Sequence, residues 1–300
     1  MRDMNNMILV DILLVTYNQE QYIQQALEGI LMQRVNPDVQ VRIIVADDYS
    51  KDSTLSCIKK ILGPKAKLAS GNEAEVVYLS AEHNLGIAGN YKRAIAATTG
   101  DYVAVLEGDD YWISPSHLQS HLDFLEENSI CVLSSNCMFV KNEIIGKFET
   151  YYPQQRNVLY SGDEQARTNR IGNLSTCVFR ANYLHVLPDE MFNMEVDDWL
   201  LGLVLAQNGY IAKICTPTSV YRINSSSNWA SMDSDATKER MLARIDAYNA
   251  FLGGKYAAAF SELKAEIMND GKTRYWKYKK WIPSFITALF KWILPPACFK

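Results

Sequence analysis

Three carboxylates follow an apolar run near the middle of the chain. Residues 103–106 are Val-Ala-Val-Leu, typical of a buried strand, and Glu107, Asp109 and Asp110 come directly after them. Carboxylates gathered at the end of a buried strand repel one another unless a cation neutralises them. Oxygen ligands suit Mg²⁺ or Mn²⁺, and substrate phosphates usually complete the coordination of such ions. One hypothesis is a metal-diphosphate site at the edge of an α/β sheet, and the alternative, which the spacing alone does not exclude, is an acidic turn that caps a helix.

The first 110 residues supply the elements that would position these carboxylates. Apolar runs alternate with segments of helical spacing, which predicts a mostly parallel sheet covered by helices on both faces. In such a sheet the polar loops after the strands meet at one edge, where open α/β sheets bind ligands. No G-x-G-x-x-G and no G-x-x-x-x-G-K-[ST] occurs, so neither a standard dinucleotide fold nor a P-loop is supported. The expected strands are Asp11–Val15, Val41–Ala46, Val76–Leu79 and Tyr102–Leu106, followed by loops 16–18, 47–50, 83–86 and 107–110.

The second half of the chain is less regular. Residues 141–170 are polar and rich in turn formers, and the chain is expected to be helical from Ala236 onwards. His117 and His121 lie four residues apart on an expected helix, and we interpret them as part of a solvated face rather than as metal ligands. The other expected elements are helices over Pro115–Glu126 and Asp197–Asn208 and strands over Ile130–Ser134, Asn136–Val140, Leu174–Phe179, Ile211–Ile214 and Ser219–Ile223.

Composition narrows the class of protein. The chain has 300 residues and a net charge of -4, so it is no general binder of polyanions and no nucleic-acid partner is expected. The six cysteines are scattered without a C-x-x-C pair, which favours reduced thiols in a cytoplasmic protein. Met1–Val15 has no signal-peptide pattern, and no segment approaches the roughly 18 apolar residues that span a bilayer.

The last thirty residues differ from the rest. Residues 271–300 carry seven basic side chains and no acidic one, and Tyr275–Trp281 interleaves aromatic residues with lysines. Basic and aromatic residues of this kind favour the surface of an anionic bilayer. We therefore expect a peripheral membrane contact through residues 272–300, on the inner face of the cytoplasmic membrane. The alternative is a helix docked on the main domain, with its lysines in solvent.

Five short motifs occur in a familiar order. They are V-T-Y-N at 15–18, A-D-D-Y-S-K-D-S-T at 46–54, N-L-G-I-A-G-N at 84–90, G-D-Y-V-A-V-L-E-G-D-D-Y-W at 100–112 and D-D-W-L-L at 197–201. Over residues 8–225 the chain resembles a family 2 glycosyltransferase. The resemblance implies an α/β fold of the GT-A type, with a Rossmann-like, mostly parallel sheet flanked by helices, and the expected helical C-terminal tail follows it. It also implies an inverting enzyme that uses a nucleoside-diphosphate sugar and Mn²⁺ or Mg²⁺.

The resemblance implies roles for particular residues. Residues expected on the nucleotide-sugar side are Thr16, Tyr17, Asn18, Asp47, Asp48, Asn84, Gly86, Glu107, Gly108 and Asp109. Asp109, with Asp110, is expected to bind the metal, and Glu107-Gly108-Asp109 stands at the family's D-x-D position. The second acid of Asp197-Asp198-Trp199 corresponds to the catalytic base, with Asp197 and Glu195 as further candidates. Arg222 and Trp229 are expected on the acceptor or diphosphate side, and Asn224 stands where the family pattern has a histidine.

Each of these roles has a structural alternative. Asp47 and Asp48 could be turn acids, Tyr17 could be core, and Asn18 could cap the helix that follows it. Asp197 or Asp198 could only cap a helix, Arg222 could pair with a structural acid, and Trp229 could cover the core.

The expected organisation is a catalytic domain over 1–235 and a helical basic and aromatic extension over 236–300. Within the domain, 1–112 would be the nucleotide-sugar half and 113–235 the acceptor half. The expected activity is sugar transfer from a UDP-sugar to a hydroxyl of a cell-surface polysaccharide or lipid-linked oligosaccharide. The alternatives are a non-catalytic relative that binds carbohydrate or nucleotide, and a sugar-phosphate nucleotidyltransferase. The latter needs a Gly-rich basic loop after the first strand, and Thr16–Gln21 contains neither glycine nor a basic residue.

Overall fold

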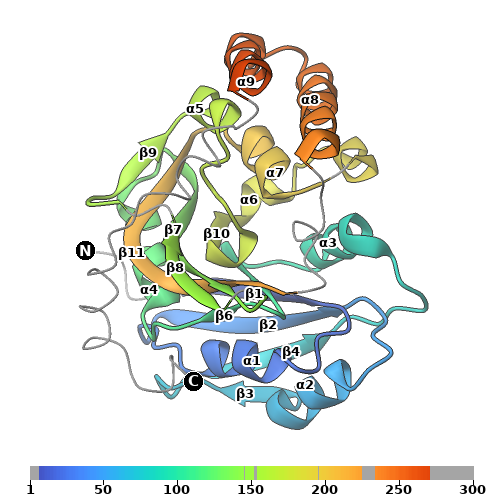
Figure 1. Ribbon diagram of the computed structural model, residues 1–300. Helices are drawn as coiled ribbons and strands as arrows, with labels where there is room; N and C mark the ends of the chain where they lie inside the picture. Colours follow the sequence, from blue (N-terminus) through green and yellow to red (C-terminus); the bar gives the residue numbers. More distant parts are fainter. Residues whose placement is uncertain (1–6, 145, 152–153, 195, 225–233, 271–300) are drawn as a thin grey trace.

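The computed structural model describes residues 7–144, 146–151, 154–194, 196–224 and 234–270. Within them, one sheet of eleven strands runs through the molecule, and helices cover both of its faces (Figure 1). The main path of the sheet has the order β3-β4-β2-β1-β5-β10-β7-β11-β6, while β8 pairs with β7 and β9 pairs with β11.

The first half of the chain forms the parallel part of the sheet, as the sequence predicts. The strands β4, β2, β1 and β5 lie side by side and all pair in parallel. The short edge strand β3 adds an antiparallel pair that the sequence did not indicate. These elements are β1 (Ile8–Thr16), α1 (Ile23–Leu31), β2 (Val39–Asp47), α2 (Thr54–Leu62), β3 (Lys65–Lys67), β4 (Glu73–Tyr78), α3 (Gly86–Ala96) and β5 (Tyr102–Glu107).

Strand alternation distributes the apolar side chains of β1 between two hydrophobic clusters. Leu13 and Val15 belong to the cluster shared with α3 and α7, whereas Ile12 and Leu14 belong to the cluster under α1, α2 and α4. A strand buried on both faces reads as a continuous apolar run, which is why the sequence located it correctly.

The second half extends the sheet with longer strands than the sequence predicted. Residues 131–142 form one strand where two were expected, and so do residues 210–223. The second of these has an irregular register between Ile214 and Ser219, at Thr216-Pro217-Thr218, because proline cannot donate to a strand ladder. Leu174–Thr176 is a 3₁₀ turn (η1) rather than strand. The strands are β6 (Tyr111–Trp112), β7 (Cys131–Asn142), β8 (Lys147–Tyr151), β9 (Val158–Tyr160), β10 (Cys177–Arg180) and β11 (Tyr210–Ile223).

The helices of the second half lie mainly on one face. In Figure 1, α8 and α9 stand beside α7 and α5, and side chains from α7, α8 and α9 share one hydrophobic cluster. A boundary at residues 235 and 236 remains a prediction. The elements are α4 (His117–Glu127), α5 (Gly162–Arg167), α6 (Ala181–Leu184), η2 (Asp189–Asn193), α7 (Asp198–Leu205), α8 (Ser234–Phe251) and α9 (Ala257–Asp270).

The expectation of a solvated face for His117 and His121 is wrong. Both rings are fully buried, because this side of α4 faces the sheet. Nδ1 of His117 lies 2.7 Å from Oγ1 of Thr218, and Nδ1 of His121 lies 2.7 Å from Oγ of Ser134. Burial lowers the pKa of both histidines, that of His121 to about 3, so both rings are neutral. They serve as core histidines.

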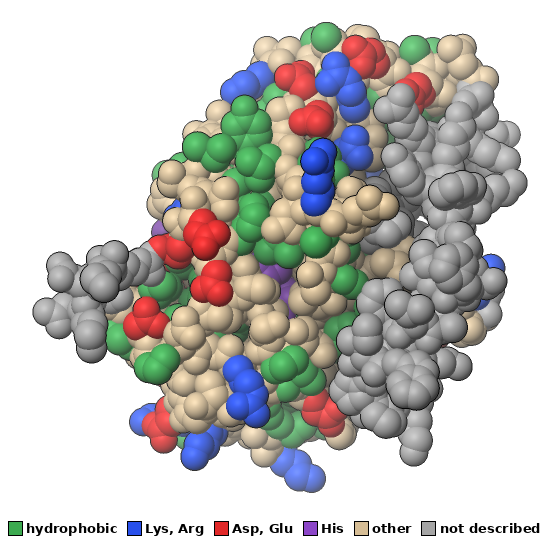
Figure 2. All heavy atoms as spheres, turned by 90° about the vertical axis from the view of Figure 1, so that its left-hand side faces the viewer, with side chains coloured by type: hydrophobic (Ala, Val, Ile, Leu, Met, Phe, Trp, Pro, Cys, Tyr) green, Lys and Arg blue, Asp and Glu red, His purple; other side chains and the backbone are tan. Residues whose placement is uncertain are grey.

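The described surface carries mixed charge. On the face shown in Figure 2, acidic and basic side chains are interspersed among the residues described there. No helix of the described part of the chain is long and apolar enough to cross a bilayer.

Candidate active site at the carboxyl edge of the sheet

The loops after β1, β2 and β5 meet at one edge of the sheet. Thr16 is the register partner of Asp47, and Val15 is the partner of Glu107, so the three strands end together. Backbone bonds continue the alignment into the loops. The N–H of Asp48 donates to the carbonyl of Thr16 over 2.9 Å, and that of Gly108 donates to the carbonyl of Val15 over 2.9 Å. The predicted convergence of polar loops is therefore present in the structure.

Asn18 ties the first loop to the second. Its N–H donates to Oγ of Ser50 (2.9 Å), and its Oδ1 accepts from the N–H of Lys51 (2.8 Å). Asn18 has a φ of 50°, and α1 begins only at Ile23, so this side chain does not cap the helix. Tyr17, at 45% exposure, is not a core residue either. An exposed aromatic ring beside these polar loops offers a surface on which a base can stack.

Asp47 and Asp48 are buried and hold the loop geometry. Asp47 accepts from both the N–H and the hydroxyl of Ser50, over 3.0 and 2.5 Å. Oδ1 of Asp48 accepts from the N–H of Leu85 over 2.8 Å, while Nδ2 of Asn84 donates to the carbonyl of Asp48 over 3.1 Å. These two acids thus shape the turns, in agreement with the alternative stated for them, and a contact with a base remains a prediction.

Gly86 starts α3 in a backbone conformation that suits glycine. Its φ is 74°, and its N–H donates to Oδ1 of Asn84 over 3.0 Å. Asn84 and Gly86 therefore form a tight turn beside Asp48, at the same edge of the sheet.

Glu107 and Asp109 are partly buried carboxylates whose negative charges repel one another. Burial and then the charge of Asp109 raise the pKa of Glu107 to about 7. Burial likewise raises the pKa of Asp109. Tyr91 donates its hydroxyl to Oε1 of Glu107 over 2.9 Å, and Nδ2 of Asn224 lies 3.3 Å from Oδ2 of Asp109. A bound cation would offset the repulsion between these two partly buried acids and stabilise their ionised forms.

Gly108 lets the backbone pass close to the first loop. A Cβ at this position would lie 2.5 Å from Oε1 of Gln19 and 2.8 Å from Oγ1 of Thr16. A larger residue at this position would have to displace the side chains of Gln19 and Thr16.

Asp110 is occupied by protein donors. Oδ1 accepts from the N–H of Arg222 (2.9 Å), and Oδ2 accepts from Nδ2 of Asn173 (3.0 Å) and Oγ of Ser175 (2.7 Å). With its carboxylate buried at 1% exposure, Asp110 fixes the loop against the second half of the chain. Asp110 therefore holds the loop in place, and its expected role as a metal ligand remains a prediction.

The oxygen atoms of this site suit a divalent cation only if substrate or water completes the coordination. Within the described residues, no group of three or more His, Cys, Asp or Glu side chains has the geometry to hold a metal. Mg²⁺ and Mn²⁺ at phosphate-binding sites commonly use one or two carboxylates and take their other ligands from phosphates and water. The partly buried oxygens of Glu107 and Asp109 fit that second arrangement.

Arg222 has a structural partner. Its Nη1 donates to Oε1 of Glu143 over 2.7 Å, its Nη2 to Oε1 of Gln25 over 2.8 Å and its Nε to the carbonyl of Asp109 over 2.7 Å. The guanidinium also lies over the ring of Tyr22, 4.7 Å from its centroid. Arg222 thus holds the loop of Asp109 through the backbone carbonyl of that residue, and a diphosphate contact remains a prediction.

The start of α7 brings two further acids to the site. Oδ1 of Asp197 accepts from the N–H of Leu200 over 3.0 Å, so Asp197 caps the helix. Asp198 instead accepts from Nδ2 of Asn169 over 2.6 Å and remains partly exposed. Burial and then the charge of Asp197 raise the pKa of Asp198 to about 6. The Asp198 charge in turn contributes to the raised pKa of Glu107, so these two acids share one electrostatic environment. Glu195 and Trp229 lie outside the described residues.

Sequence reasoning missed the segment that links these acids. Residues 168–176 donate to Asp198 through Asn169 and to Asp110 through Asn173 and Ser175. Oγ of Ser175 also accepts from the N–H of Glu107 over 3.0 Å. The only signal in the sequence is the polar run Thr168-Asn169-Arg170, which reads as an ordinary turn.

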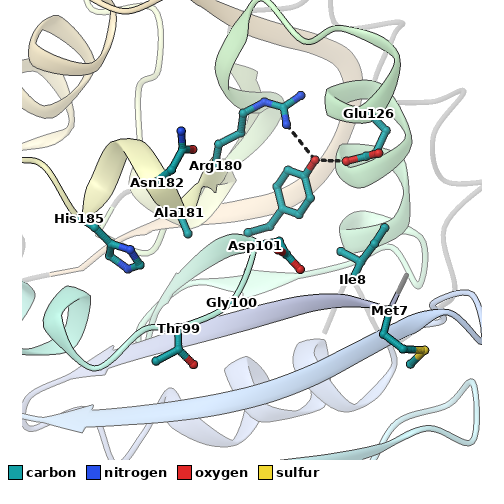
Figure 3. Close-up of a pocket in the computed structure, with 11 residues that line it drawn as sticks. Met7, Ile8, Thr99, Gly100, Asp101, Glu126, Arg180, Ala181, Asn182 and His185 are labelled. Carbon is teal, nitrogen blue, oxygen red and sulfur yellow. Dashed lines mark hydrogen bonds between the residues drawn. The ribbon is translucent and has the colours of Figure 1, made fainter. Parts of the chain in front are cut away.

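A separate cavity lies at the opposite edge of the sheet. Its volume is about 470 Å³, and Figure 3 shows residues from the starts of β1 and β5 and from α6 around it. Arg180, the largest polar residue there, donates to the hydroxyl of Tyr102 over 3.0 Å and to the carbonyl of Cys131 over 3.0 Å. None of the predicted site residues lines this cavity.

The chain matches a known protein family over much of its length. The family described as Glycosyl transferase family 2 matches residues 11–179, which is more than half of the chain.

Among curated proteins, the uncharacterized protein Rv1520 of Mycobacterium tuberculosis is 28% identical over 273 residues, covering 88% of this chain and 75% of that protein. WfaP of Escherichia coli, a UDP-Glc:alpha-D-GlcNAc-diphosphoundecaprenol beta-1,3-glucosyltransferase, is 27% identical over 139 residues. That match covers 46% of this chain and 50% of WfaP.

Solved structures with a similar fold include two that cover most of this chain. TarS 1–349 of S. aureus, in complex with UDP-GlcNAc, has a TM-score of 0.61 at 19% identity, covering 88% of this chain and 72% of that chain. The mannosyltransferase PcManGT from Pyrobaculum calidifontis, in complex with GDP-Man and Mn²⁺, has a TM-score of 0.54 at 15% identity, covering 99% and 84%. At these identities the likeness concerns the fold alone, and it confirms the expected α/β class.

Proposed function

We propose that this chain, which belongs to glycosyl transferase family 2 and has the GT-A fold, moves a sugar from a nucleoside-diphosphate sugar to an acceptor hydroxyl. The proposal rests on the acids at the end of β5 and the acid at the start of α7, which interact electrostatically. Glu107 and Asp109 end β5, Asp198 begins α7, and the charge of Asp198 raises the pKa of Glu107. A glycosyltransferase needs a group that neutralises the charge of the leaving diphosphate and a base that takes the proton of the acceptor hydroxyl.

The proposed chemistry is a direct displacement at the anomeric carbon. Asp198 takes the proton of the acceptor hydroxyl while the new glycosidic bond forms, and the bond to the diphosphate breaks on the opposite side of the sugar. Displacement from the opposite side inverts the anomeric configuration. Asp198 is suited to this role because it is partly exposed and its pKa of about 6 leaves it ionised at neutral pH.

Asp109, with Glu107 nearby, would hold Mn²⁺ or Mg²⁺. When bound, the ion supplies Lewis-acid stabilisation of the charge on the leaving diphosphate. Asn224 and Gln19, both hydrogen-bonded to Asp109, would orient that carboxylate. The exposed ring of Tyr17 would take the base.

We take a UDP-sugar as the donor and a saccharide or lipid-linked oligosaccharide as the acceptor. The names of two similar proteins support this, since WfaP uses UDP-Glc with a diphosphoundecaprenol-linked acceptor and TarS was crystallised with UDP-GlcNAc. A lipid-linked acceptor would place the enzyme at the inner face of the cytoplasmic membrane. The basic and aromatic residues 272–300 would supply a peripheral contact there, although they lie outside the described residues.

The first experiment measures thermal stabilisation and donor hydrolysis with UDP-, GDP- and dTDP-sugars, each with and without Mn²⁺ or Mg²⁺. We expect one donor class to stabilise the protein only with metal, and Asp109→Asn to abolish that stabilisation. Asp198→Asn should keep the stabilisation and lose transfer by a factor of roughly 10² to 10⁴, as expected for loss of a general base.

Asp189→Asn is the matched control, because this carboxylate is exposed and its ion-pair partner is Lys92 rather than a residue of the site. It should bind donor and transfer sugar like the wild type. If no donor stabilises the wild-type protein under any metal condition, a non-catalytic relative becomes the better description.

A further inference from the structure

We infer that α8 belongs to the catalytic machinery: Arg244 and Tyr248 are positioning residues that hold Asp197 and thereby fix the first turn of α7, which carries Asp198. The inference deepens the proposed function, on which it rests for the role of Asp198 as base. It assigns a role to a helix that the sequence places in a C-terminal extension.

Asp197 receives donors from two elements. Within α7, its Oδ1 accepts from the N–H of Leu200 over 3.0 Å. From α8, Nη2 of Arg244 forms an ion pair with Oδ2 of Asp197, and the hydroxyl of Tyr248 donates to Oδ1 over 3.2 Å. Nη2 of Arg244 also donates to the Tyr248 hydroxyl over 3.1 Å, so these three groups form a closed network. The helix cap accounts for one of the two carboxylate oxygens, and α8 engages both.

The side chains that α8 contributes to this network are buried. Arg244 is 8% exposed and Tyr248 is 1% exposed. The guanidinium lies 5.8 Å from the ring centroid of Trp199, the residue that follows Asp198, and 5.4 Å from that of Tyr248. Trp199 in turn meets Tyr248 edge to face, with the centroids 5.6 Å apart. Residues on both sides of Asp198 are therefore fixed by α8.

The charge of Arg244 also reaches Asp198. Burial and Asp197 raise the pKa of Asp198, whereas Asn169 and Arg244 lower it. Glu107 on β5, Cys177 on β10 and Lys213 on β11 also interact with Asp198 electrostatically. Among these neighbours Arg244 is the cation that contacts the adjacent acid, so its removal should both loosen the turn and disfavour the ionised base.

A second ion pair provides a matched control. Arg167 on α5 bonds Glu262 on α9 over 2.5 Å, and both side chains are substantially exposed. This pair also fastens a C-terminal helix to the rest of the molecule, but it does not touch Asp197. A purely structural role for α8 predicts similar behaviour of Arg167→Met and Arg244→Met once differences in stability are taken into account.

The experiment compares Arg244→Met, Arg244→Lys, Tyr248→Phe and Arg167→Met with the wild type, well below each melting temperature. For Arg244→Met we expect kcat to fall between about tenfold and about 100-fold at an unchanged donor KM, the scale of a misplaced catalytic group. The acid limb of its pH profile should move to higher pH. Arg244→Lys should restore the position of the limb but only part of kcat, because lysine keeps the charge and loses the planar fork. Arg167→Met should leave kcat and the limb unchanged.

A second measurement does not need transfer activity. With ¹³C-labelled aspartate, the Asp198 carboxyl resonance, assigned with Asp198→Asn, is titrated in the wild type and in Arg244→Met. We expect its pKa to rise in the variant and to stay unchanged in Arg167→Met. An unmoved pKa together with an unmoved kcat in folded Arg244→Met overturns the inference. A raised pKa in a protein that transfers no sugar from any donor sustains the coupling and overturns the proposed function instead.

Discussion

At the scale of single residues, hydrogen bonds decide which acid is available for chemistry. Asp110 has both oxygens engaged by Asn173, Ser175 and the N–H of Arg222, whereas Asp198 is partly exposed and receives one side-chain amide donor, from Asn169. The five carboxylates of the two short motifs, at 107–110 and 197–198, therefore divide into structural and reactive groups. Sequence spacing alone treats them alike.

The raised pKa of Asp198 predicts the acid limb of the pH profile. A base must be deprotonated, and a folded-state pKa of about 6 means that Asp198 becomes protonated as the pH falls through 6. We expect kcat/KM to be level above pH 7 and to fall about tenfold per pH unit well below 6. The measurement is initial rates between pH 4.5 and 8.5, with stability checked at each pH. A profile that stays flat down to pH 5 would argue against Asp198 as the base.

Asn169 offers a second test at this scale. Its Oδ1 accepts from the N–H groups of Ile171 and Gly172 over 3.2 and 3.4 Å, which directs Nδ2 at Asp198. In Asn169→Asp a carboxylate faces Asp198, so the pKa of Asp198 should rise and the acid limb should move to higher pH. Rates at pH 6 should fall more than rates at pH 8.

Asn182→Asp is the control for this substitution, because Asn182 is exposed at the far cavity of Figure 3. Equal losses at pH 6 and pH 8 in Asn169→Asp would show that the variant acts on binding or folding and not on the base.

At the scale of elements, α1 positions the segment that follows the acids. A Cβ at Gly29 would lie 2.9 Å from both the N and the O atom of Trp112, so the helix touches the backbone of β6. Gln33, two residues after the end of α1, donates to the carbonyl of Ser114 over 2.9 Å and accepts from the N–H of Leu118 over 3.1 Å. One helix thus sets both the strand after Asp110 and the start of α4.

Gly29→Ala should therefore destabilise the protein and disturb the site together. Forcing a methyl group into this contact typically costs about 1–3 kcal/mol. We expect a lower free energy of unfolding in denaturant and weaker metal-dependent stabilisation by the donor. Glu28→Ala, one residue away on the exposed side of α1, should change neither. A fully stable Gly29→Ala would show that α1 and β6 can separate without cost.

The parallel half of the sheet was predictable from the sequence, and so was the convergence of its loops. Its strands are buried on both faces and read as apolar runs. The second half was predicted less well because its long strands carry polar residues inside the fold. The prediction divided β7 at buried Ser135 and divided β11 at residues 215–218, which include Pro217. A polar residue or a proline inside a strand looks like a strand end in a sequence.

The partners of the site were the least predictable part. Asn169 lies 29 residues before Asp198, and Arg244 lies 47 residues after Asp197. Neither belongs to a motif, and α8 has no apolar periodicity strong enough to indicate what it contacts. The acids themselves could be found because they lie close together in short sequence motifs. The groups that position them come from distant parts of the chain and are brought close only by tertiary packing.

At the scale of the whole molecule, charge is unevenly divided along the chain. With seven basic residues and no acid in 271–300, the rest of the chain carries the difference between -4 and +7, or -11. An acidic body joined to a basic, aromatic segment suits a protein that touches an anionic surface through one end only.

Deletion of residues 272–300 tests that contact. The full chain should sediment with vesicles that contain anionic lipid and dissociate from them as salt is raised, because screening weakens the attraction. The shortened chain should remain in the supernatant and keep its donor-dependent stabilisation. Neutral vesicles serve as the control, and equal sedimentation of both chains would rule out the segment as the contact.

The position of β10 has a consequence for how the protein is made. This strand lies between β5 and β7, although residues 131–142 of β7 precede it in the chain. Until residue 180 has left the ribosome, the edge of β5 that ends in Glu107 lacks its partner, and an open apolar edge is a place for unwanted pairing. The two halves of the site are joined only when this late strand is inserted. We expect the nascent chain to depend most on chaperones between the emergence of β5 and that of β10.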